Sequence, residues 1–407
     1  MASLYVHELN GVLNISNRTF FYKDISGYTT EASEHVSVDE SLQNTRFVVQ
    51  GILTPVIVTI GLLGNILNIV VLFQPSMRTS TNVYLLVLSL ADTVFLVFHL
   101  ALSILDCRKR GLHHSAYYFN PYGRFMSNYS GNVGVWVTVV FTVERYIAVC
   151  HPMQGKVWCT VSRAEIASLS VVILALINTI PTLFELEVVS TVLGPRCSYA
   201  QFASSFSYEI GYSWWYVTVF TFIPFICLTI FNCVLIRALF VAARKRQQMA
   251  LVTTTIAKHN DANTKSKKDS QHTLVQDSIS VTQMSDRSST ASNITPCSVK
   301  VKPRQNKRST REQNKVTIML ITIVMIFLLC QLPWTALYLY KTYLSSNNIT
   351  SSSTALKIAG NICNLLTLVN ASVNFYLYSC FSKRFRHTLA KLMLFWRRSY
   401  ASSPTTV

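Results

Sequence analysis

Thr142-Val-Glu-Arg-Tyr-Ile-Ala-Val-Cys-His-Pro152 decides the fold of this chain, because it places an acid and a cation together at the end of a long apolar run. That run, residues 124–150, is long enough to cross a bilayer, which takes about 20 mostly apolar residues. Charge inside lipid is expensive and usually functional. Polar side chains also lie within apolar runs at Leu88-Ser-Leu-Ala-Asp92 and at Asn374-Phe-Tyr-Leu-Tyr378. The sequence therefore predicts a membrane protein with three polar sites along its spans.

The composition agrees with a membrane protein. Of 407 residues, 50% are hydrophobic and 13% are charged, and the mean hydropathy is +0.33, whereas a soluble domain has about 25% charged residues. The net charge of +18 lies largely beside apolar runs, where basic residues set topology and contact anionic lipid. We therefore expect no nucleic-acid partner. No Cys/His spacing typical of a metal site occurs, and we expect no metal.

Seven apolar runs predict an all-α bundle of transmembrane helices, because lipid leaves only helices or closed barrels and these runs lack strand alternation. They cover residues 47–73, 82–106, 124–150, 164–186, 208–242, 315–341 and 355–380. The bundle thus extends over residues 47–380. Between the fifth and sixth runs, residues 243–314 are rich in Ser, Thr, Lys and Asn, and we expect them to be disordered except for helical extensions at their ends.

Basic residues indicate the orientation. They are dense in residues 243–314 and after the last span, whereas residues 1–46 hold several acids. The positive-inside rule therefore predicts an extracellular N-terminal tail and a cytoplasmic tail, residues 396–407, in a multi-pass protein of the plasma membrane. Asn14 and Asn17 begin glycosylation sequons in the outer tail. Arg108-Lys-Arg110 conflicts with this topology, which places it outside.

The segment after the last span predicts a second type of helix. Residues 381–395 are basic and amphipathic, with apolar side chains at helical spacing, so this helix should lie on membrane lipid as a surface helix. The chain ends in Thr405-Thr-Val407, which suits strand addition to a PDZ domain. Tail hydroxyls are candidate phosphosites for arrestin: Ser399, Ser402, Ser403, Thr405 and Thr406.

The three polar stretches, in this order and at these separations, resemble the signature sites of rhodopsin-like (class A) G-protein-coupled receptors. The resemblance covers residues 47–395. It implies that Glu144, Arg145 and Tyr146 form the coupling site, whose arginine leaves its restraints on activation and contacts a heterotrimeric G protein. Asn374 and Tyr378 then belong to the activation switch, although Phe375 replaces the family's proline.

Cys330-Gln-Leu-Pro-Trp334 resembles the family's hinge motif in the sixth span. Pro333 removes one backbone hydrogen bond and gives a hinge, while Gln331 stands where the family has a pivoting tryptophan. The resemblance also implies a packing switch between Phe327 and Pro224. A kinked helix without a signalling role is the alternative.

Asp92 is expected to meet amides from two other spans, Asn65, Asn370 and Asn374. In the family this cluster binds an allosteric sodium ion, and no other cofactor is implied. Gly134 and Ala371 replace hydroxyl residues of that site. A structural hydrogen-bond cluster is therefore the alternative.

The resemblance further implies a disulfide between the second external loop and the start of the third span. Asn120 stands at the usual cysteine position. Cys197 remains in the loop, and Cys107 is the other exterior candidate, so a Cys107–Cys197 bridge is expected.

The outer ends of the spans offer acids and aromatic rings for a ligand. Ser127 stands where aminergic receptors have an aspartate, which argues against an amine. Acids with aromatics suit a peptide carrying arginine and aromatic side chains, although aromatic belts occur at any membrane surface. The candidate ligand residues are Asp106, Ser127, Glu185, Glu187, Glu209, Gln331, Trp334 and Tyr338.

Three phrases narrow the resemblance to invertebrate FMRFamide-type neuropeptide receptors: Glu144-Arg-Tyr-Ile-Ala-Val-Cys-His-Pro-Met-Gln-Gly-Lys156, Cys159-Thr-Val-Ser-Arg163 and Asn374-Phe-Tyr-Leu-Tyr378. The implied ligand is an amidated RFamide-like peptide. A non-amine small molecule is the alternative within the receptor class. A transporter or channel would show repeated topology and more midplane charge, and an enzyme would need a nucleophile–base pair, which the spans lack.

Overall fold

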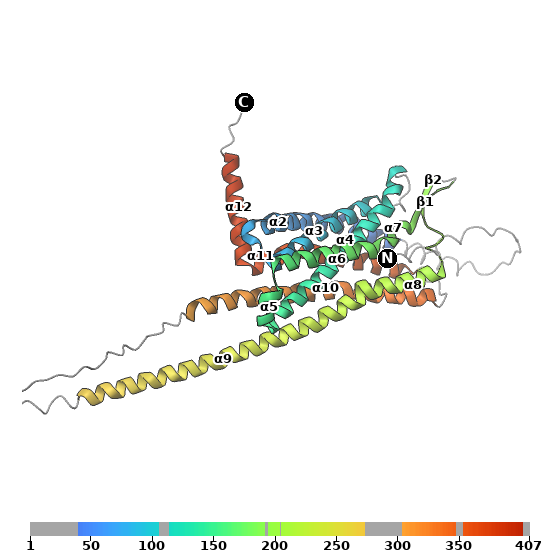
Figure 1. The fold of residues 1–407 in the computed structure, drawn as a ribbon. Coiled ribbons are helices and arrows are strands. Elements are labelled where there is room, and N and C mark those ends of the chain that lie inside the picture. Colours follow the sequence, from blue (N-terminus) through green and yellow to red (C-terminus); the bar gives the residue numbers. More distant parts are fainter. Residues whose placement is uncertain are drawn as a thin grey trace, which may run out of the picture. The chain divides into compact units, whose positions relative to one another are not determined.

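The computed structural model describes residues 40–105, 114–191, 194–203, 205–272, 303–346 and 353–401. Within these residues it is mostly helical (Figure 1). In chain order the elements are η1 (Phe47–Leu53), α2 (Thr54–Leu72), η2 (Pro75–Met77), α3 (Ser80–Ile104), α4 (His114–Cys150), α5 (Pro152–Trp158), α6 (Val161–Thr179), α7 (Pro181–Phe184), β1 (Leu186–Thr191), β2 (Gly194–Tyr199), α8 (Phe206–Val217), η3 (Thr218–Phe222), α9 (Ile223–His272), α10 (Pro303–Ser346), α11 (Thr354–Phe381) and α12 (Lys383–Ala401).

The predicted seven-helix membrane fold is confirmed. The described residues contain seven helical segments long and apolar enough to cross a membrane, and a helix, α12, follows the last. The seven spans are Glu40–Leu72, Ser80–Ile104, Ala116–Cys150, Val161–Phe184, Trp214–Lys245, Ile321–Lys341 and Thr354–Phe381.

The chain forms two compact units. One contains the described residues up to Leu235 and from Lys315, and the other is Ile236–Asn314. The second unit holds the continuation of α9 to His272 and the start of α10 at Pro303. Helical extensions were expected at both ends of residues 243–314, and residues 243–272 and 303–314 lie in the helices α9 and α10. Residues 273–302 lie outside the described residues.

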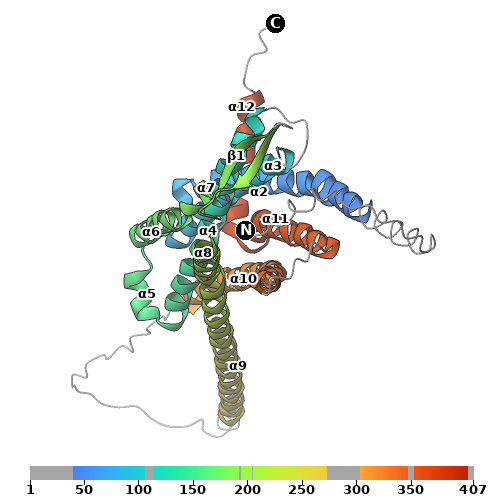
Figure 2. The ribbon, with the colours of Figure 1, turned by 90° about the vertical axis from the view of Figure 1, so that its right-hand side faces the viewer.

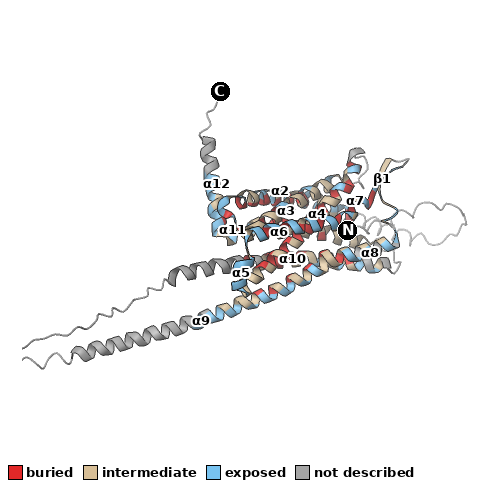
Figure 3. Ribbon diagram, viewed as in Figure 1, coloured by how far each residue is buried: buried red, intermediate tan, exposed pale blue. Residues whose placement is uncertain are grey.

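In the first unit, α4 is the central helix. It packs against α3, α5, α6 and α7, while α3 also contacts α2, α6 and α11. Figures 1 and 2 show α2, α3, α4, α6 and α11 side by side. Figure 3 shows buried positions along the helices of this unit. Leu88, Val137 and Val324 are among the buried residues. Large apolar side chains such as Leu63 and Ile166 are exposed on the outside, as suits helices whose solvent is lipid.

Two glycines let α2 approach α11 closely. A Cβ atom on Gly61 would lie 2.8 Å from the Cβ of Ser372 and 2.9 Å from Cδ1 of Leu96, and one on Gly64 would lie 2.8 Å from the Cβ of Phe375. Small residues at such positions allow membrane helices to pack backbone against backbone. This approach fixes the register of α11, which carries Asn370 and Asn374.

Helix α4 begins at His114, ten residues before the expected start at 124, and Pro121 lies inside it. The side chain of Asn120 donates hydrogen bonds to the carbonyl oxygens of Leu105 (2.7 Å) and Ala116 (2.9 Å). These bonds join the end of α3 to the first turns of α4. The polar stretch before residue 124 is thus part of the helix, and the side-chain amide of Asn120 within it is satisfied by nearby carbonyl groups.

Beyond α7, strands β1 and β2 form an antiparallel hairpin in which Val188 pairs with Cys197. Gly194 begins β2 with φ +109°, a conformation that favours glycine. Cys197 Sγ lies 3.9 Å from the carbonyl oxygen of Tyr117 in α4, so the hairpin rests on the start of that helix.

Helix α12 begins at a capped turn, since the Phe385 amide donates to Ser382 Oγ at 3.2 Å. Phe385 is buried against the rings of Phe375 and Tyr378, with centroids 6.1 and 6.4 Å away. Arg386 donates to the carbonyl oxygens of Ser379 (2.8 Å) and Cys380 (2.7 Å). An arginine there satisfies the last carbonyl groups of α11.

Candidate functional site

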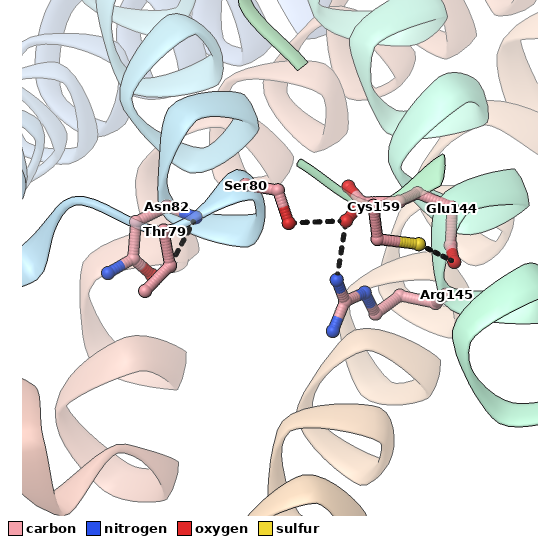
Figure 4. Close-up of polar contacts among 6 residues, drawn as sticks. All are labelled: Thr79, Ser80, Asn82, Glu144, Arg145 and Cys159. Atoms are coloured by element: carbon pink, nitrogen blue, oxygen red, sulfur yellow. Dashed lines mark hydrogen bonds and ion pairs between the residues drawn. The ribbon is translucent and has the colours of Figure 1, made fainter. Parts of the chain in front are cut away.

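Glu144 and Arg145 form an ion pair at the end of α4, with Arg145 Nη2 2.8 Å from Glu144 Oε1. Ser80, the first residue of α3, donates its hydroxyl to the same oxygen at 2.6 Å (Figure 4). The side chains of Arg145 and Glu144 are only 15% and 8% exposed. A charged pair with so little water around it holds its geometry well, and separating the two partners is costly.

Neighbouring groups frame this pair. Thr79 caps α3 by accepting a hydrogen bond from the Asn82 amide at 3.3 Å, which fixes where Ser80 lies. The Arg145 guanidinium lies 5.7 Å from the ring centroid of Phe141. The thiol of Cys159 donates to the Glu144 carbonyl oxygen at 3.7 Å (Figure 4). Burial, and then the charge of Glu144, raises the pKa of the Cys159 thiol, so it stays a protonated donor.

Tyr146 contacts His151 and Phe231. Its hydroxyl lies 3.2 Å from His151 Nε2, and its ring packs on Phe231 of α9 at 5.3 Å between centroids. Tyr146 therefore joins α4 to the turn before α5 and to α9.

In the middle of the bundle, Asn374 donates its amide to Asp92 Oδ2 at 2.6 Å, and both residues are buried. Asn65 instead donates to the backbone carbonyl oxygen of Ala371 at 2.9 Å. Asn370 lines the cavity beside Asp92. The structure thus brings α2, α3 and α11 together through these four residues, and among them Asn374 is the one that bonds the carboxyl directly.

The cluster fits a sodium ion poorly. A buried cation needs oxygen atoms around it, and one carboxylate oxygen of Asp92 is already bonded to Asn374. Gly134 has no side chain, although a Cβ there would lie 3.8 Å from Asp92 Oδ1, and Ala371 offers no hydroxyl. Among the described residues, no group of three or more His, Cys, Asp and Glu could hold a metal.

A cavity of about 130 Å³ is lined in part by Asp92, Asn370 and Asn374 of this cluster. Three of the predicted ligand residues line it: Ser127 of α4, and Gln331 and Trp334 of α10. The predicted switch residue Phe327 also lines it. Tyr338 is buried, and its ring stacks on Trp334 at 5.3 Å between centroids. The other lining residues are Leu88, Asp92, Phe95, Asn128, Gly131, Asn132, Gly134, Val135, Thr138, Tyr216, Phe220, Thr221, Ile323, Thr367, Asn370, Ala371 and Asn374.

One wall of the cavity continues as an aromatic column along α8 and η3. Tyr208, Tyr212, Tyr216 and Phe220 follow one another with ring centroids 5.1, 6.0 and 5.0 Å apart. The hydroxyl of Tyr216 and the side chain of Asn132 exchange hydrogen bonds at 3.0 and 3.2 Å. This column reaches from the β-hairpin end of the bundle to the cavity.

The predicted acids differ in their access. Glu185 is 1% exposed and accepts a hydrogen bond from the Tyr208 hydroxyl at 3.2 Å, and burial raises the pKa of its carboxyl. Glu187 on β1 is exposed. Glu209 lies in α8, but its side chain is outside the described part, and so is Asp106. The structure therefore brings none of these acids into the cavity lining that it describes.

The predicted switch residues lie on three helices. Pro333 is inside α10, which continues through it. Pro224 follows the π-helical turn η3, where Ile223 bonds to Thr218; a proline lacks the amide that an α-helical turn requires there. Tyr378 is buried, and its hydroxyl has no hydrogen-bond partner among the described residues.

Some predicted residues lie outside the described part of the chain. These are Cys107, so the disulfide with Cys197 stays a prediction, and the sequon residues Asn14 and Asn17.

Sequence reasoning missed Ser80 and the pair Asn132–Tyr216. Ser80 is separated from Glu144 by a whole span in the sequence. The Glu144-Arg145-Tyr146 motif indicates only the contact between Glu144 and its neighbour Arg145. The available signal was the Thr79-Ser80 dipeptide at the start of an apolar run, which is typical of a helix cap.

Comparisons with known proteins agree with this architecture. A family model described as "7 transmembrane receptor (rhodopsin family)" matches residues 64–378. The chain is 26% identical to the FMRFamide receptor of Drosophila melanogaster over 373 residues, 88% of this chain and 56% of that protein. Its identity to the sex peptide receptor of Drosophila melanogaster is 22%, covering 84% and 72% of the two chains. Its identity to the thyrotropin-releasing hormone receptor of Homo sapiens is 25%, covering 85% and 78%.

The matched part therefore spans little more than half of that FMRFamide receptor and most of the other two. The family model itself covers more than half of this chain, and it is a family of receptors and not of enzymes. Seven apolar helices and this match together make the chain a multi-pass protein of the plasma membrane. The chain belongs to the rhodopsin family of seven-transmembrane receptors.

Proposed function

We propose that this chain is a receptor for an extracellular neuropeptide of the amidated RFamide type and that it activates heterotrimeric G proteins. The observation that carries the proposal is that one helix, α4, serves two sites. Ser127 and Asn132 of α4 line the cavity, and Glu144 and Arg145 at its end form the restrained ion pair. A ligand in the cavity and a protein at Arg145 therefore act on the same rigid element.

The coupling mechanism is a shift between two states of the bundle. In the state with the Ser80–Glu144–Arg145 contacts, the arginine is held and largely buried. A peptide that binds more tightly to a state without these contacts frees Arg145 to meet the G protein, and it shifts the equilibrium only by that difference in affinity. Pro333 gives α10 the hinge at which the bundle opens.

The peptide class is supported by the relatives and by the outer end of the bundle. Two of the relatives carry peptides in their names, FMRFamide and sex peptide. An arginine in the ligand would pair with an outer acid, of which Glu187 is exposed, and its aromatic side chains would meet Trp334 and the tyrosines of the aromatic column.

The orientation follows from charge. Lys383, Arg384, Arg386 and Lys391 lie in or at the start of α12, at the end of the chain that we place in the cytoplasm. In this topology Asn14 and Asn17 carry glycans outside, the Cys107–Cys197 bridge ties the hairpin to the outer end of α3, and α12 lies on anionic lipid. Arrestin and a PDZ domain at Thr405–Val407 are the further cytoplasmic partners.

The test is a second-messenger screen. Cells with verified surface expression would receive amidated neuropeptides, including Phe-Met-Arg-Phe-NH2, while calcium and cAMP are recorded. We expect a response at nanomolar peptide that Arg145→Ala abolishes without loss of surface binding. No response across the panel removes the RFamide class, and a normal response of the Arg145 variant removes the coupling mechanism.

A further inference from the structure

The cavity is unusual in its charge. Among the described residues that line it there is one carboxyl group, that of Asp92, and no lysine, arginine or histidine. The Asp92 carboxyl is already engaged by the Asn374 amide at 2.6 Å. A ligand group that carries a negative charge would meet no cation there and would lose its water, which is strongly unfavourable.

The polar lining is instead rich in side-chain carboxamides. Five of the lining residues carry one: Asn128, Asn132, Gln331, Asn370 and Asn374. Asn132 is bonded to Thr179 (3.1 Å) and to Tyr216. By contrast, the amide oxygen of Gln331 is buried and has no hydrogen-bond partner in the part of the chain that the structure describes. A buried acceptor without a donor is costly, and an incoming N–H group would remove that cost.

We propose that this cavity receives the terminal carboxamide of an amidated peptide and that Gln331 accepts a hydrogen bond from its N–H2 group. The inference rests on the proposed function, which it deepens by assigning the residue that distinguishes a peptide amide from a free acid. A carboxamide is neutral and both donates and accepts, so it matches asparagine and glutamine side chains. A terminal carboxylate offers no donor to Gln331.

The surroundings of Gln331 fit the residue that precedes such an amide. Trp334 lies one turn along α10, lines the cavity and stacks on Tyr338. Phe327 lines the cavity one turn earlier. These rings form an apolar wall suited to an aromatic side chain. Because Gln331 lies two residues before Pro333, the amide contact is made on the helix that carries the hinge.

The experiment compares Phe-Met-Arg-Phe-NH2 with the same peptide as a free acid on the full chain. We expect the wild type to prefer the amide by about a hundredfold or more in potency. Gln331→Leu should lower amide potency about tenfold to a hundredfold. Gln331→Lys supplies a cation and should shift the preference toward the acid. Gln74→Leu, the same exchange outside the cavity, is the matched control and should keep the wild-type ratio.

A second measurement separates this inference from the identity of the peptide. The thermal stability of the purified receptor would be recorded with millimolar N-acetylphenylalaninamide or N-acetylphenylalanine. Stabilisation by N-acetylphenylalaninamide alone, if it is lost in Gln331→Leu, supports the inference. This holds even if the longer peptide gives no signal, because a silent peptide overturns only the RFamide class. Equal stabilisation by both probes, no stabilisation by either, or an amide preference unchanged in both Gln331 variants overturns it.

Discussion

Ser80 Oγ donates to Glu144 Oε1 at 2.6 Å, the same oxygen that Arg145 contacts at 2.8 Å. The first residue of α3 thereby holds the acid near the end of α4. An acceptor shared between a hydroxyl and a guanidinium has its charge spread over two donors, and each bond keeps the other in place. Ser80 is therefore part of the restraint on Arg145.

Ser80→Ala should raise signalling in the absence of ligand. The hydrogen bond to an ionised group is worth about 1.5–3 kcal/mol, and losing part of it should raise basal G-protein activation about twofold to tenfold. Basal activity per surface receptor is the measurement. Ser170→Ala is the matched control, since Ser170 is exposed and bonds only to its own helix. Equal basal activity in the two variants would exclude Ser80 from the restraint.

The close approach of α2 and α11 predicts opposite effects for two glycine exchanges. Gly61→Ala should destabilise the receptor by about 1–3 kcal/mol, because the new methyl group would press on Ser372 and Leu96. Gly211→Ala should stabilise it by about 0.5–1 kcal/mol, because nothing lies within 4 Å and alanine favours the helix. Thermal inactivation of the solubilised receptor compares them. A Gly61 variant as stable as the Gly211 variant would contradict the packing.

Most of the fold could be predicted from the sequence, because long apolar runs leave helices as the only answer in lipid. The polar cluster around Asp92 could also be predicted from the sequence, because a buried carboxyl needs an amide partner, and Asn374 is bonded to it. What escaped prediction depends on side chains that satisfy one another across helices. Asn120 keeps residues 114–123 helical by bonding Leu105 and Ala116, and no run of apolar letters signals that.

Ligand residues were harder to predict than the fold for the same reason. Acidity alone indicates Glu185 as a ligand residue, but that side chain is buried and accepts a hydrogen bond from Tyr208. Gln331 was recognised as a substitution at the hinge, whereas its unpartnered oxygen is visible only in three dimensions.

Glu185 should make stability depend on pH. Burial raises the pKa of its carboxyl above the ordinary 4.5, against the opposing effects of the Tyr208 hydroxyl and the Arg124 charge. A raised pKa means that ionisation is more costly in the folded state, so stability is greatest below pH 4.5 for this group and falls as pH rises toward the folded pKa. Glu185→Gln should flatten this part of the pH profile of thermal inactivation. An identical slope in wild type and variant would refute the assignment.

The same variant tests whether Glu185 contacts the ligand. Because the carboxyl is 1% exposed, we expect Glu185→Gln to keep peptide potency within about threefold of wild type. A lost ligand contact worth roughly 1.4 kcal/mol would instead lower potency about tenfold. Glu187→Gln is the paired exchange at an exposed acid of the same hairpin. Dose–response curves that weaken strongly for Glu185 and not for Glu187 would show that the hairpin lifts on binding.

Asn68 is a polar side chain in the interior of the bundle. It is fully buried in α2, and among the described residues neither its amide nitrogen nor its amide oxygen has a hydrogen-bond partner. Asn68→Leu should therefore stabilise the receptor by about 1–3 kcal/mol, because it removes two unsatisfied polar groups at similar volume. Asn120→Leu is the matched exchange with the opposite expectation, since it deprives the carbonyl groups of Leu105 and Ala116 of their donor. Thermal inactivation measures both.

The opposite result for Asn68 would have a specific cause. Residues of the first span lie opposite residues of α11 that are 311 positions later in the sequence. Three pairs show this: Gln50 with Asn361, Gly61 with Ser372, and Gly64 with Phe375. The same offset places Ser379 opposite Asn68, and the Ser379 hydroxyl is also buried with no partner among the residues that the structure describes. If Asn68→Leu and Ser379→Ala both lowered stability, an ordered water joining the two side chains would explain it, because such a water satisfies several buried polar groups at once. Stabilisation by Asn68→Leu alone means that the amide is a polar group the bundle tolerates at a cost.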